Sequence, residues 1–428
     1  MCRKTPLRSA SDQWDGYPVS DTNSIGALFR AHGERYIQAY KPHQRAIAFI
    51  RSVRLCRTPG LGRIVYTCKG CGEQVTIYKS CGNSQCPVCQ SIKREQWADA
   101  LQGKLLRIPY VHLVFTMPHQ LNGLARSNKS AVYSILMRAA WKTVQAQMKD
   151  KTVLPGMTAV LHTFGSDMKY HVHVHALVTF GGLEPSGKWV YPTHRYWIAS
   201  FRKMCGTFKA ISLQLIRKDI AQKKITSQQG NEDLLHEVGK IRWVVHSTRA
   251  TTQTDVLKSY LARYINRIAI SNNRLKYLAQ TDEVAILYND YRNQQNECAA
   301  PKAIKHLDPL TAIHQIIQHV LPRHFQKSRH YGLHHTCTLI RNQAEEAIKA
   351  HPATVRTALQ IITALLKREL YQCDYCQGQS FIKTEYPPDR IYLGQYLAPG
   401  TERAPPTSWR RPVHQRADRS TTAYPSFA

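Results

Sequence analysis

Residues 170–180 read YHVHVHALVTF and decide the fold, because they first alternate strictly and then continue as an apolar run. Alternate side chains of a β-strand face the same side, so His171, His173 and His175 share one face of the predicted strand. Charged imidazoles gathered in this way would repel one another, and a shared metal ion removes that cost. Adjacent positions on one face lie about 6.6 Å apart, so one ion can bind His173 with either neighbour but not both outer histidines. The alternative is a histidine-rich strand that binds no metal.

The segments around this strand predict an antiparallel sheet accompanied by helices. Helical spacing or capping signals predict helices within residues 24–54 (two, broken at Pro42), 90–107, 130–148, 195–216, 252–268 and 308–321. Short β-branched and aromatic runs predict further strands at residues 108–118, 157–165 and 241–247. This order of elements indicates an α+β domain built on an antiparallel sheet.

The charge of the chain indicates a polyanionic partner. Lys and Arg together number 59 against 28 for Asp and Glu, so the formal net charge is +31. Such an excess repels itself in the folded state, which favours nucleic acid as the partner over a merely solubilising role. A membrane-surface protein would concentrate this charge beside an amphipathic helix, whereas here it is spread along the chain. We find no run of about 20 apolar residues and no secretory signal, so we expect the protein to stay where it is made.

Two closely spaced cysteine pairs predict a zinc site. Cys68 and Cys71 form one C-x2-C knuckle, and Cys86 and Cys89 form another fourteen residues further on. Four thiolates that converge at about 2.3 Å satisfy tetrahedral zinc and leave no open position for substrate, so this zinc is expected to be structural.

The remaining cysteines near these pairs are less clearly assigned. Cys56 and Cys81 either complete a second site with a histidine such as His43 or are simply buried thiols. Cys373 and Cys376 form a further knuckle, but the sequence places no partner knuckle near it, so a metal there stays open.

A pair of tyrosines follows the last predicted strand. Tyr260 and Tyr264 stand four residues apart in the predicted helix 252–268 and therefore share one helix face. On spacing alone, two aromatic residues on one face indicate core packing. A phenol can instead attack a DNA phosphodiester where a metal polarises the phosphate, and here a histidine cluster and a basic chain accompany the pair.

Together these motifs resemble the rolling-circle transposases of the insertion-sequence ninety-one family. The likeness covers roughly residues 28–376 and is carried, in order, by CRTPGLG, YTCKGCG, SCGNSQCPVCQ, YVHLVFTMPHQL, VLHTFG, YHVHVHALVTFGGL, WVVHSTR, YLARYINRIAISNNRL and HVLPRHFQKSRHYGL. The chain departs from the family pattern at Gln85, where relatives often carry histidine, at Val172, where proline is common, and at Arg249, where lysine is frequent. None of these departures removes a residue that the chemistry needs.

The resemblance implies a single-strand nuclease of the His-hydrophobic-His type, with a central antiparallel sheet flanked by helices. It selects His173 and His175 as the ligand pair of a catalytic divalent ion, Mg²⁺ or Mn²⁺, beside the structural zinc. The third ligand stays open among His171, His112 and His162.

The resemblance also assigns the nucleophiles. It places the family's two tyrosines on Tyr260 and Tyr264, which would form a 5′-phosphotyrosine and release a 3′-OH. Arg263 and Lys258 are candidate DNA contacts, with solvated helix charges as the default interpretation. The expected partners are single-stranded DNA at transposon ends and target DNA, in the cytoplasm of a bacterium and associated with its nucleoid through DNA.

The family pattern and the composition suggest domain boundaries. Residues 1–23 are expected to be a flexible N-terminus, and residues 377–428, rich in Pro, Arg and Ser, a disordered basic tail. Between them we expect a helical and zinc-binding domain at residues 24–100, a catalytic domain at residues 101–275 and a helical region at residues 276–376.

Three other functions compete with transposition. A plasmid replication initiator or relaxase would use the same residues at a fixed origin. A non-catalytic zinc-dependent regulator would bind DNA without nicking it. An RNA-binding protein would prefer RNA over single-stranded DNA in a competition assay.

Overall fold

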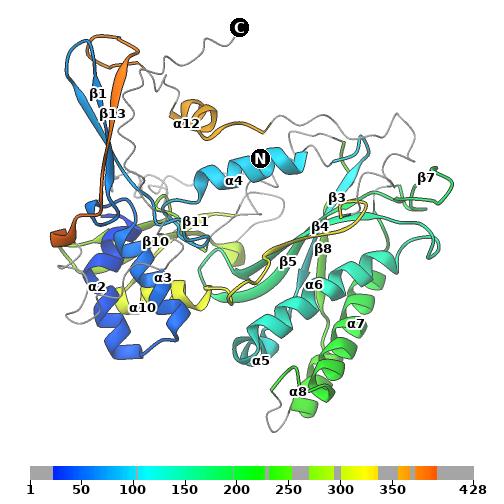
Figure 1. Ribbon diagram of the computed structural model, residues 1–428. Helices are drawn as coiled ribbons and strands as arrows, with labels where there is room; N and C mark the ends of the chain where they lie inside the picture. Colours follow the sequence, from blue (N-terminus) through cyan, green and yellow to red (C-terminus); the bar gives the residue numbers. More distant parts are fainter. Residues whose placement is uncertain are drawn as a thin grey trace.

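The structure is a computed structural model that describes residues 23–102, 105–195, 197–226, 231–252, 269–293, 300–335, 355–366 and 372–392. At its centre is an antiparallel sheet (Figure 1) with the strand order β12-β4-β5-β3-β8. Its strands are β3 (Tyr110–Thr116), β4 (Gly156–Phe164), β5 (Tyr170–Thr179), β8 (Val244–Ser247) and β12 (Ser328–Gly332). Every neighbouring pair is antiparallel, which confirms the predicted α+β fold on a central antiparallel sheet.

Helices cover one face of the central sheet. They are α5 (Asn122–Ser127), α6 (Lys129–Gln145), α7 (Phe201–Ala221) and α8 (Asn231–Lys240). Val172, Val174 and Val178 of β5 are fully buried in the core that the sheet forms with these helices. Each such side chain contributes about 1.5–3 kcal/mol relative to exposure. Because successive residues of β5 face opposite sides, its histidines lie on the face away from α6 and α7.

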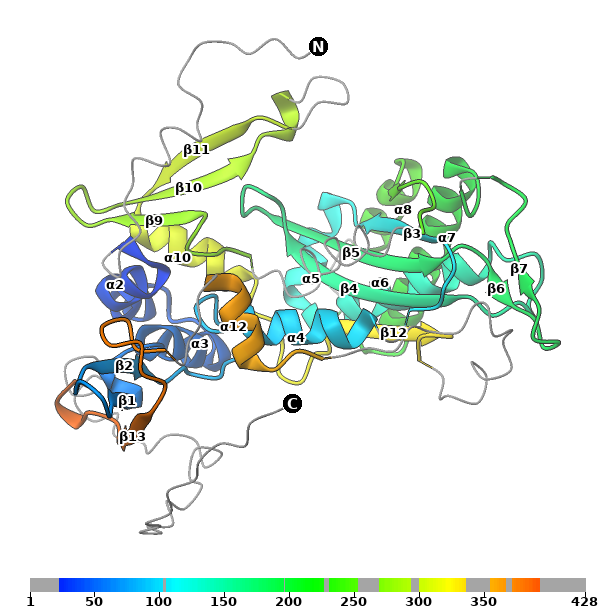
Figure 2. The ribbon, with the colours of Figure 1, turned by 90° about the horizontal axis from the view of Figure 1, so that it is seen from above.

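A helical module packs beside the central sheet, on the left of Figure 2. It consists of α2 (Ile25–Tyr40), α3 (Gln44–Leu55), α10 (Pro309–Gln318) and a sheet of β9 (Leu275–Leu278), β10 (Glu283–Asn289) and β11 (Lys302–Leu307). The hydroxyl of Ser24 caps α2 by accepting the N–H of Ala27, and Lys41 follows the last helical residue in the left-handed conformation, directly before Pro42. The two helices predicted within residues 24–54 are therefore confirmed.

The prediction of a helical region at residues 276–376 is wrong for its first part. The chain there forms β10 and β11, which pair along their length, and the end of β9. A turn at Asp282, whose φ is 50°, lets β9 and β10 fold back on each other. The β-branched and aromatic side chains of EVAILYN favour a strand over a helix once a partner strand lies alongside.

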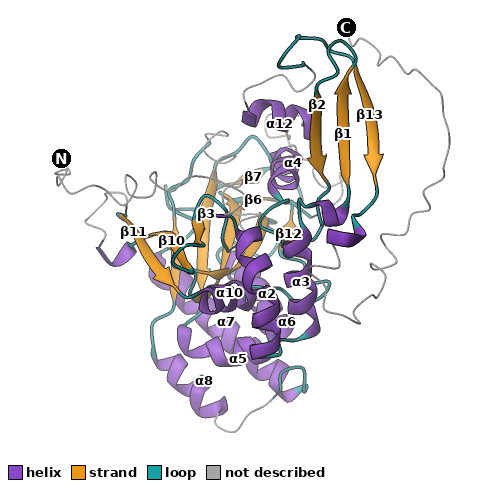
Figure 3. Cartoon of the chain, turned by 90° about the vertical axis from the view of Figure 1, so that its left-hand side faces the viewer, coloured by secondary structure: helices purple, strands orange, loops and turns teal. Residues whose placement is uncertain are grey.

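A third sheet projects from the helical module (Figure 3) and is called the ribbon below. It is formed by β13 (Phe381–Tyr386), β1 (Arg63–Cys68) and β2 (Gln74–Tyr78), with β1 in the middle. The prediction of a disordered tail from residue 377 is wrong for β13. Local composition favoured disorder there, but the backbone of β1 offers β13 a complete antiparallel register from Arg63–Tyr386 to Cys68–Phe381.

Two helices from distant parts of the sequence lie side by side. α4 (Ser91–Gln102) lies beside α12 (Ala358–Leu366), and the Arg356 guanidinium bonds both carboxylate oxygens of Asp99 at 2.8 and 2.9 Å. Shorter elements are η2 (Pro59–Leu61), η3 (His119–Leu121), η4 (Tyr291–Asn293), β6 (Gly182–Leu183) and β7 (Trp189–Val190). Among the described residues, no helix has both the length and the apolarity that a membrane span requires.

Candidate metal centres

Three imidazoles meet on the face of the central sheet opposite α6 and α7. His173 and His175 lie on β5, and His162 lies on β4 in register with His173. One ring nitrogen of each lies within 4.8 Å of the others, and Nε2 of His173 is 3.0 Å from Nε2 of His175. Two nitrogens bound to one ion at about 2.1 Å and at a right angle would lie about 3.0 Å apart, so the pair fits a shared ion.

The backbone orients His173. Its Nδ1–H donates to the carbonyl oxygen of His171 at 2.9 Å, which leaves the lone pair of Nε2 facing His175. An outer hydrogen bond of this kind fixes the tautomer and the ring orientation of a metal ligand. The ring of His171 lies outside the three-histidine group, with its centroid 5.0 Å from that of His173. Burial lowers the pKa of His171, against the opposing effect of the Asp167 carboxylate.

His112 supports the group from β3. Its Nε2 lies 3.0 Å from Nδ1 of His175, and the two rings stack. Burial, and then the nearby His246 and His173, lowers the pKa of His112 well below its usual range. A neutral His112 can accept the Nδ1–H of His175, which fixes the tautomer in which Nε2 of His175 carries a lone pair.

The sequence left three histidines open as the third ligand, and the structure places them differently. His162 joins His173 and His175, whereas His112 and His171 contact this pair from outside the group. The spacing of histidines within β5 cannot predict which histidine of another strand joins His173 and His175. That depends on the register between β4 and β5.

The proposed nucleophiles Tyr260 and Tyr264, together with Arg263 and Lys258, lie outside the residues that the structure describes. The same holds for the whole helix predicted at residues 252–268 apart from its first residue.

The predicted set of Cys68, Cys71, Cys86 and Cys89 as one zinc site is wrong. The structure separates the two knuckles, because the β1–β2 hairpin carries Cys68 and Cys71 away to the end of the ribbon. Among the described residues, all cysteines are free thiols, and eight of them form two groups of four.

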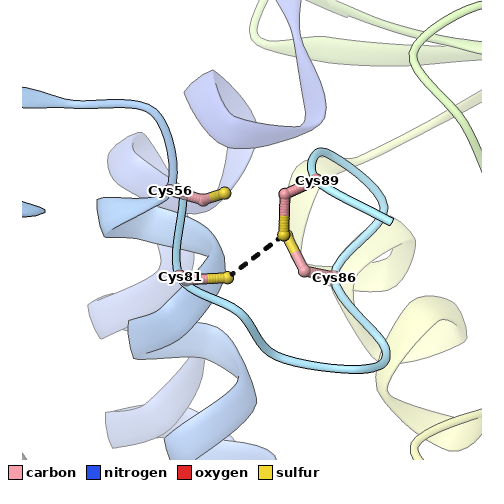
Figure 4. Close-up of side chains that lie close together, drawn as sticks. All are labelled: Cys56, Cys81, Cys86 and Cys89. Carbon is pink, nitrogen blue, oxygen red and sulfur yellow. Dashed lines mark hydrogen bonds between the residues drawn. The ribbon is translucent and has the colours of Figure 1, made fainter. Parts of the chain in front are cut away.

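The first of these groups consists of Cys56, Cys81, Cys86 and Cys89 (Figure 4). Their sulfur atoms point toward one another at the end of α3, and Sγ of Cys81 lies 3.8 Å from Sγ of Cys89. Thiolates on one tetrahedral zinc at about 2.3 Å would lie about 3.8 Å apart. The backbone N–H of Val88 also points at Sγ of Cys86, at 3.4 Å, as expected around a metal-bound sulfur.

Cys56 and Cys81 therefore lie with a predicted knuckle rather than with a histidine. His43, the suggested partner, instead caps α3 by accepting the N–H of Ala46 at 3.3 Å. The second group combines Cys68 and Cys71 with Cys373 and Cys376.

Comparisons with known proteins match two parts of the chain to families. Residues 28–117 match a family model described as "Transposase zinc-binding domain", and residues 156–342 match one described as "Putative transposase". The chain is 30% identical over 324 residues to "Putative transposase y4qJ" of Sinorhizobium fredii, which covers 72% of this chain and 79% of that protein. It is 27% identical over 286 residues to "Transposase for insertion sequence element IS801" of Pseudomonas savastanoi pv. phaseolicola, which covers 65% and 67% respectively. No solved structure matches the chain.

Proposed function

Because the chain belongs to the insertion-sequence ninety-one family of transposases, with its N-terminal zinc-binding domain, we propose that it cleaves and rejoins single strands of DNA through phosphotyrosine intermediates. Rolling-circle transposition of an insertion sequence is the process that this chemistry would serve. The observation that carries the proposal is the group of His162, His173 and His175, whose ligand atoms lie within 4.8 Å of one another.

These three histidines are the proposed ligands of a catalytic divalent ion, Mn²⁺ or Mg²⁺. Imidazole donors favour Mn²⁺ of the two, because Mg²⁺ prefers oxygen ligands. When bound, such an ion supplies the positive charge that polarises a scissile phosphate. The chain contributes preorganisation: His162 is only 2% exposed, and His173 and His175 are 8% exposed, so their rings are held by packing before DNA arrives.

Tyr260 and Tyr264 are the proposed nucleophiles. The phenolic oxygen of one tyrosine bonds to phosphorus while the bond from phosphorus to the 3′ oxygen breaks, and the phenol proton passes to that departing oxygen. The products are a 5′-phosphotyrosine and a free 3′-OH. Since the phosphoester bond is conserved, attack by a 3′-OH in the reverse direction rejoins DNA without ATP. The second tyrosine allows a second strand transfer before the first link is resolved.

The residues that flank the tyrosine segment support this assignment. Thr251 exchanges two backbone hydrogen bonds with Tyr110, the first residue of β3, at 2.8 and 2.9 Å. Ala269 is buried and lines a pocket with Phe164, the last residue of β4. β3 and β4 are the two strands that pair with β5. Thr251 and Ala269, the described residues on either side of the proposed tyrosine segment, therefore both lie beside strands that carry histidines.

Single-stranded DNA at the element ends and target DNA are the proposed substrates. The net charge of +31 suits a phosphate backbone, and Arg263 and Lys258 are proposed contacts near the tyrosines. The group of Cys56, Cys81, Cys86 and Cys89 is proposed to hold the structural zinc of the zinc-binding domain.

A covalent-adduct assay tests the proposed chemistry. The full chain is incubated with labelled single strands of the element ends and Mn²⁺, and denaturing gels then report any protein–DNA adduct. We expect an adduct with Mn²⁺ and none with EDTA. A label placed on the 5′ side of the cut should appear on a released strand that ends in a free 3′-OH. Specific DNA binding without any adduct, at every divalent ion tried, would leave the chain as a regulator rather than a nuclease.

A further inference from the structure

Two knuckles that are far apart in the chain meet at the end of the ribbon. Sγ of Cys68 lies 3.5 Å from Sγ of Cys376, and Sγ of Cys71 lies 3.5 Å from Sγ of Cys373. All four sulfur atoms lie within 4.8 Å of one another. Because thiolates on a tetrahedral zinc lie about 3.8 Å apart, these sulfurs surround a position of the right size for that ion.

The two knuckles have similar backbone conformations. The N–H of Gly72 bonds to the carbonyl oxygen of Cys68, and the N–H of Gln377 bonds to that of Cys373, both at 2.9 Å. Gly72 and Gln377, each directly after the second cysteine, have φ values of 77° and 59°. A glutamine in this left-handed conformation is strained, so surrounding structure must hold it there.

Glycines let the backbone approach the sulfurs closely. A Cβ added to Gly70 would lie 3.3 Å from Sγ of Cys376, and one added to Gly378 would lie 3.2 Å from the same atom. One glycine comes from each knuckle, so both halves of the site are shaped around the sulfur cluster.

The ribbon has little apolar core that would explain this convergence. β2 is exposed from Gln74 to Ile77, and β13 is exposed from Ile382 to Tyr386. Val75 is 45% exposed and Ile382 53%. Small sheets without a buried face are marginal in water, and modules of this kind take their folding free energy from bound metal.

Disulfides do not account for the arrangement. A disulfide requires a sulfur–sulfur distance of about 2.05 Å, which is well below the separations in this cluster. Two of the sulfurs, those of the buried Cys68 and Cys373, are also shielded within the knuckles, while Cys71 and Cys376 reach the surface.

We propose that Cys68, Cys71, Cys373 and Cys376 bind a second structural zinc ion. This site joins residues more than 300 positions apart, so it fastens the segment that ends in β13 to the N-terminal module. The matched zinc-binding family model ends at residue 117 and thus contains only half of these ligands. The site shares no residue with the histidine group.

Zinc stoichiometry of the full chain tests the proposal. We expect two zinc ions per chain by mass spectrometric metal analysis, and one per chain in the Cys373→Ser/Cys376→Ser double variant. The matched control is Cys205→Ser, a buried cysteine of α7 outside both groups, which should keep two. Cys376→His should also keep two, because imidazole can replace a thiolate as a zinc ligand. A double variant that retains the zinc content of the wild type overturns the proposal.

A measurement on the unaltered chain covers the case in which the double variant does not fold. Cobalt exchanged for zinc reports tetrathiolate sites by thiolate-to-metal charge-transfer absorption, and we expect an intensity that corresponds to two such sites. Absorption for one site overturns the proposal. Trypsin gives a further readout: chelation should release β13 from β1, so the peptide bond after the already exposed Lys383, which pairs with Tyr66, should be cleaved early. Neither readout depends on DNA cleavage, so failure here is distinguishable from failure of the nuclease proposal.

Discussion

Nε2–H of His319 donates to the carbonyl oxygen of Met168 at 3.1 Å, while its Nδ1 faces the hydroxyl of Thr163 at 3.2 Å. His319 follows α10 of the helical module, whereas Thr163 lies on β4, so this buried imidazole joins the module to the central sheet. Both contacts suit the neutral ring, with Nε2 as donor and Nδ1 as acceptor.

This arrangement predicts acid sensitivity. Burial lowers the pKa of His319 from 6.5 to about 4. Between these values the unfolded chain binds a proton that the folded chain does not, so stability falls as pH drops from 6.5 toward 4. The loss is on the order of 3 kcal/mol. His319→Gln keeps a donor and an acceptor but does not titrate, so its thermal midpoint should change less between pH 7 and pH 5 than that of the wild type.

The matched control for this prediction is His119→Gln, which alters an exposed histidine of η3. It should follow the wild type at both pH values. An equal acid response of His319→Gln and the wild type would contradict the role assigned to this ring.

A second prediction concerns His112. His112→Phe keeps an aromatic ring but removes the acceptor for Nδ1–H of His175, so the affinity of the histidine group for Mn²⁺ should fall about 10–100-fold. Isothermal titration with Mn²⁺ measures this. His246→Phe on the neighbouring β8, an exposed site, should leave the affinity nearly unchanged. Equal effects of the two variants would contradict the role proposed for His112 in orienting His175.

The third prediction distinguishes the proposed ligand His173 from His171, its neighbour on the same face of β5. His173→Ala should abolish strand cleavage and leave DNA affinity nearly intact, since affinity comes mainly from phosphate contacts by Lys and Arg. His171→Ala should have a milder effect. The hydrogen bond that orients His173 is accepted by the backbone oxygen of residue 171, which alanine retains. Complete loss in His171→Ala beside an active His175→Ala would show that the ligand pair is wrongly chosen.

The fourth prediction tests the nucleophiles. Tyr260→Phe and Tyr264→Phe keep the rings and so most of any packing, while removing the attacking oxygen. Each single variant should be able to nick DNA at one phosphate but should transpose poorly, and the double variant should form no covalent adduct. Mass spectrometry of the adduct identifies the linked residue. Adduct formation that is unchanged in the double variant would assign the tyrosines to core packing.

Local alternation in the sequence was sufficient to predict β5 and its histidine face. Strict period-two spacing indicates a β-strand with one apolar face, and here the apolar face is formed by the buried Val172 and Val174. The position of His162 was not predictable in the same way. It depends on which residue of β4 lies opposite His173, and register is set by pairing between strands rather than by either strand alone.

The two groups of cysteines show even more clearly that spacing in the sequence does not determine which residues meet in space. Proximity in sequence grouped Cys71 with Cys86, but Cys71 lies in the turn of the β1–β2 hairpin, which carries it away from Cys86 and into a different cluster. Cys71 instead groups with Cys373 and Cys376, which lie at the end of the predicted helical region, directly before the predicted disordered tail. Only long-range pairing of β1 with β13 brings them together.

That pairing has a consequence for synthesis of the protein. β1 emerges from the ribosome long before β13, which begins at residue 381, so the ribbon is completed only after the central sheet has been made. During that interval the edge of β1 that β13 will cover lacks its native partner, a condition that invites pairing with other chains. A message truncated before the codon for Cys373 would yield a chain that keeps His162, His173 and His175 but has a permanently open edge on β1. Gene copies shortened at their 3′ end should therefore encode aggregation-prone protein rather than a competing nuclease.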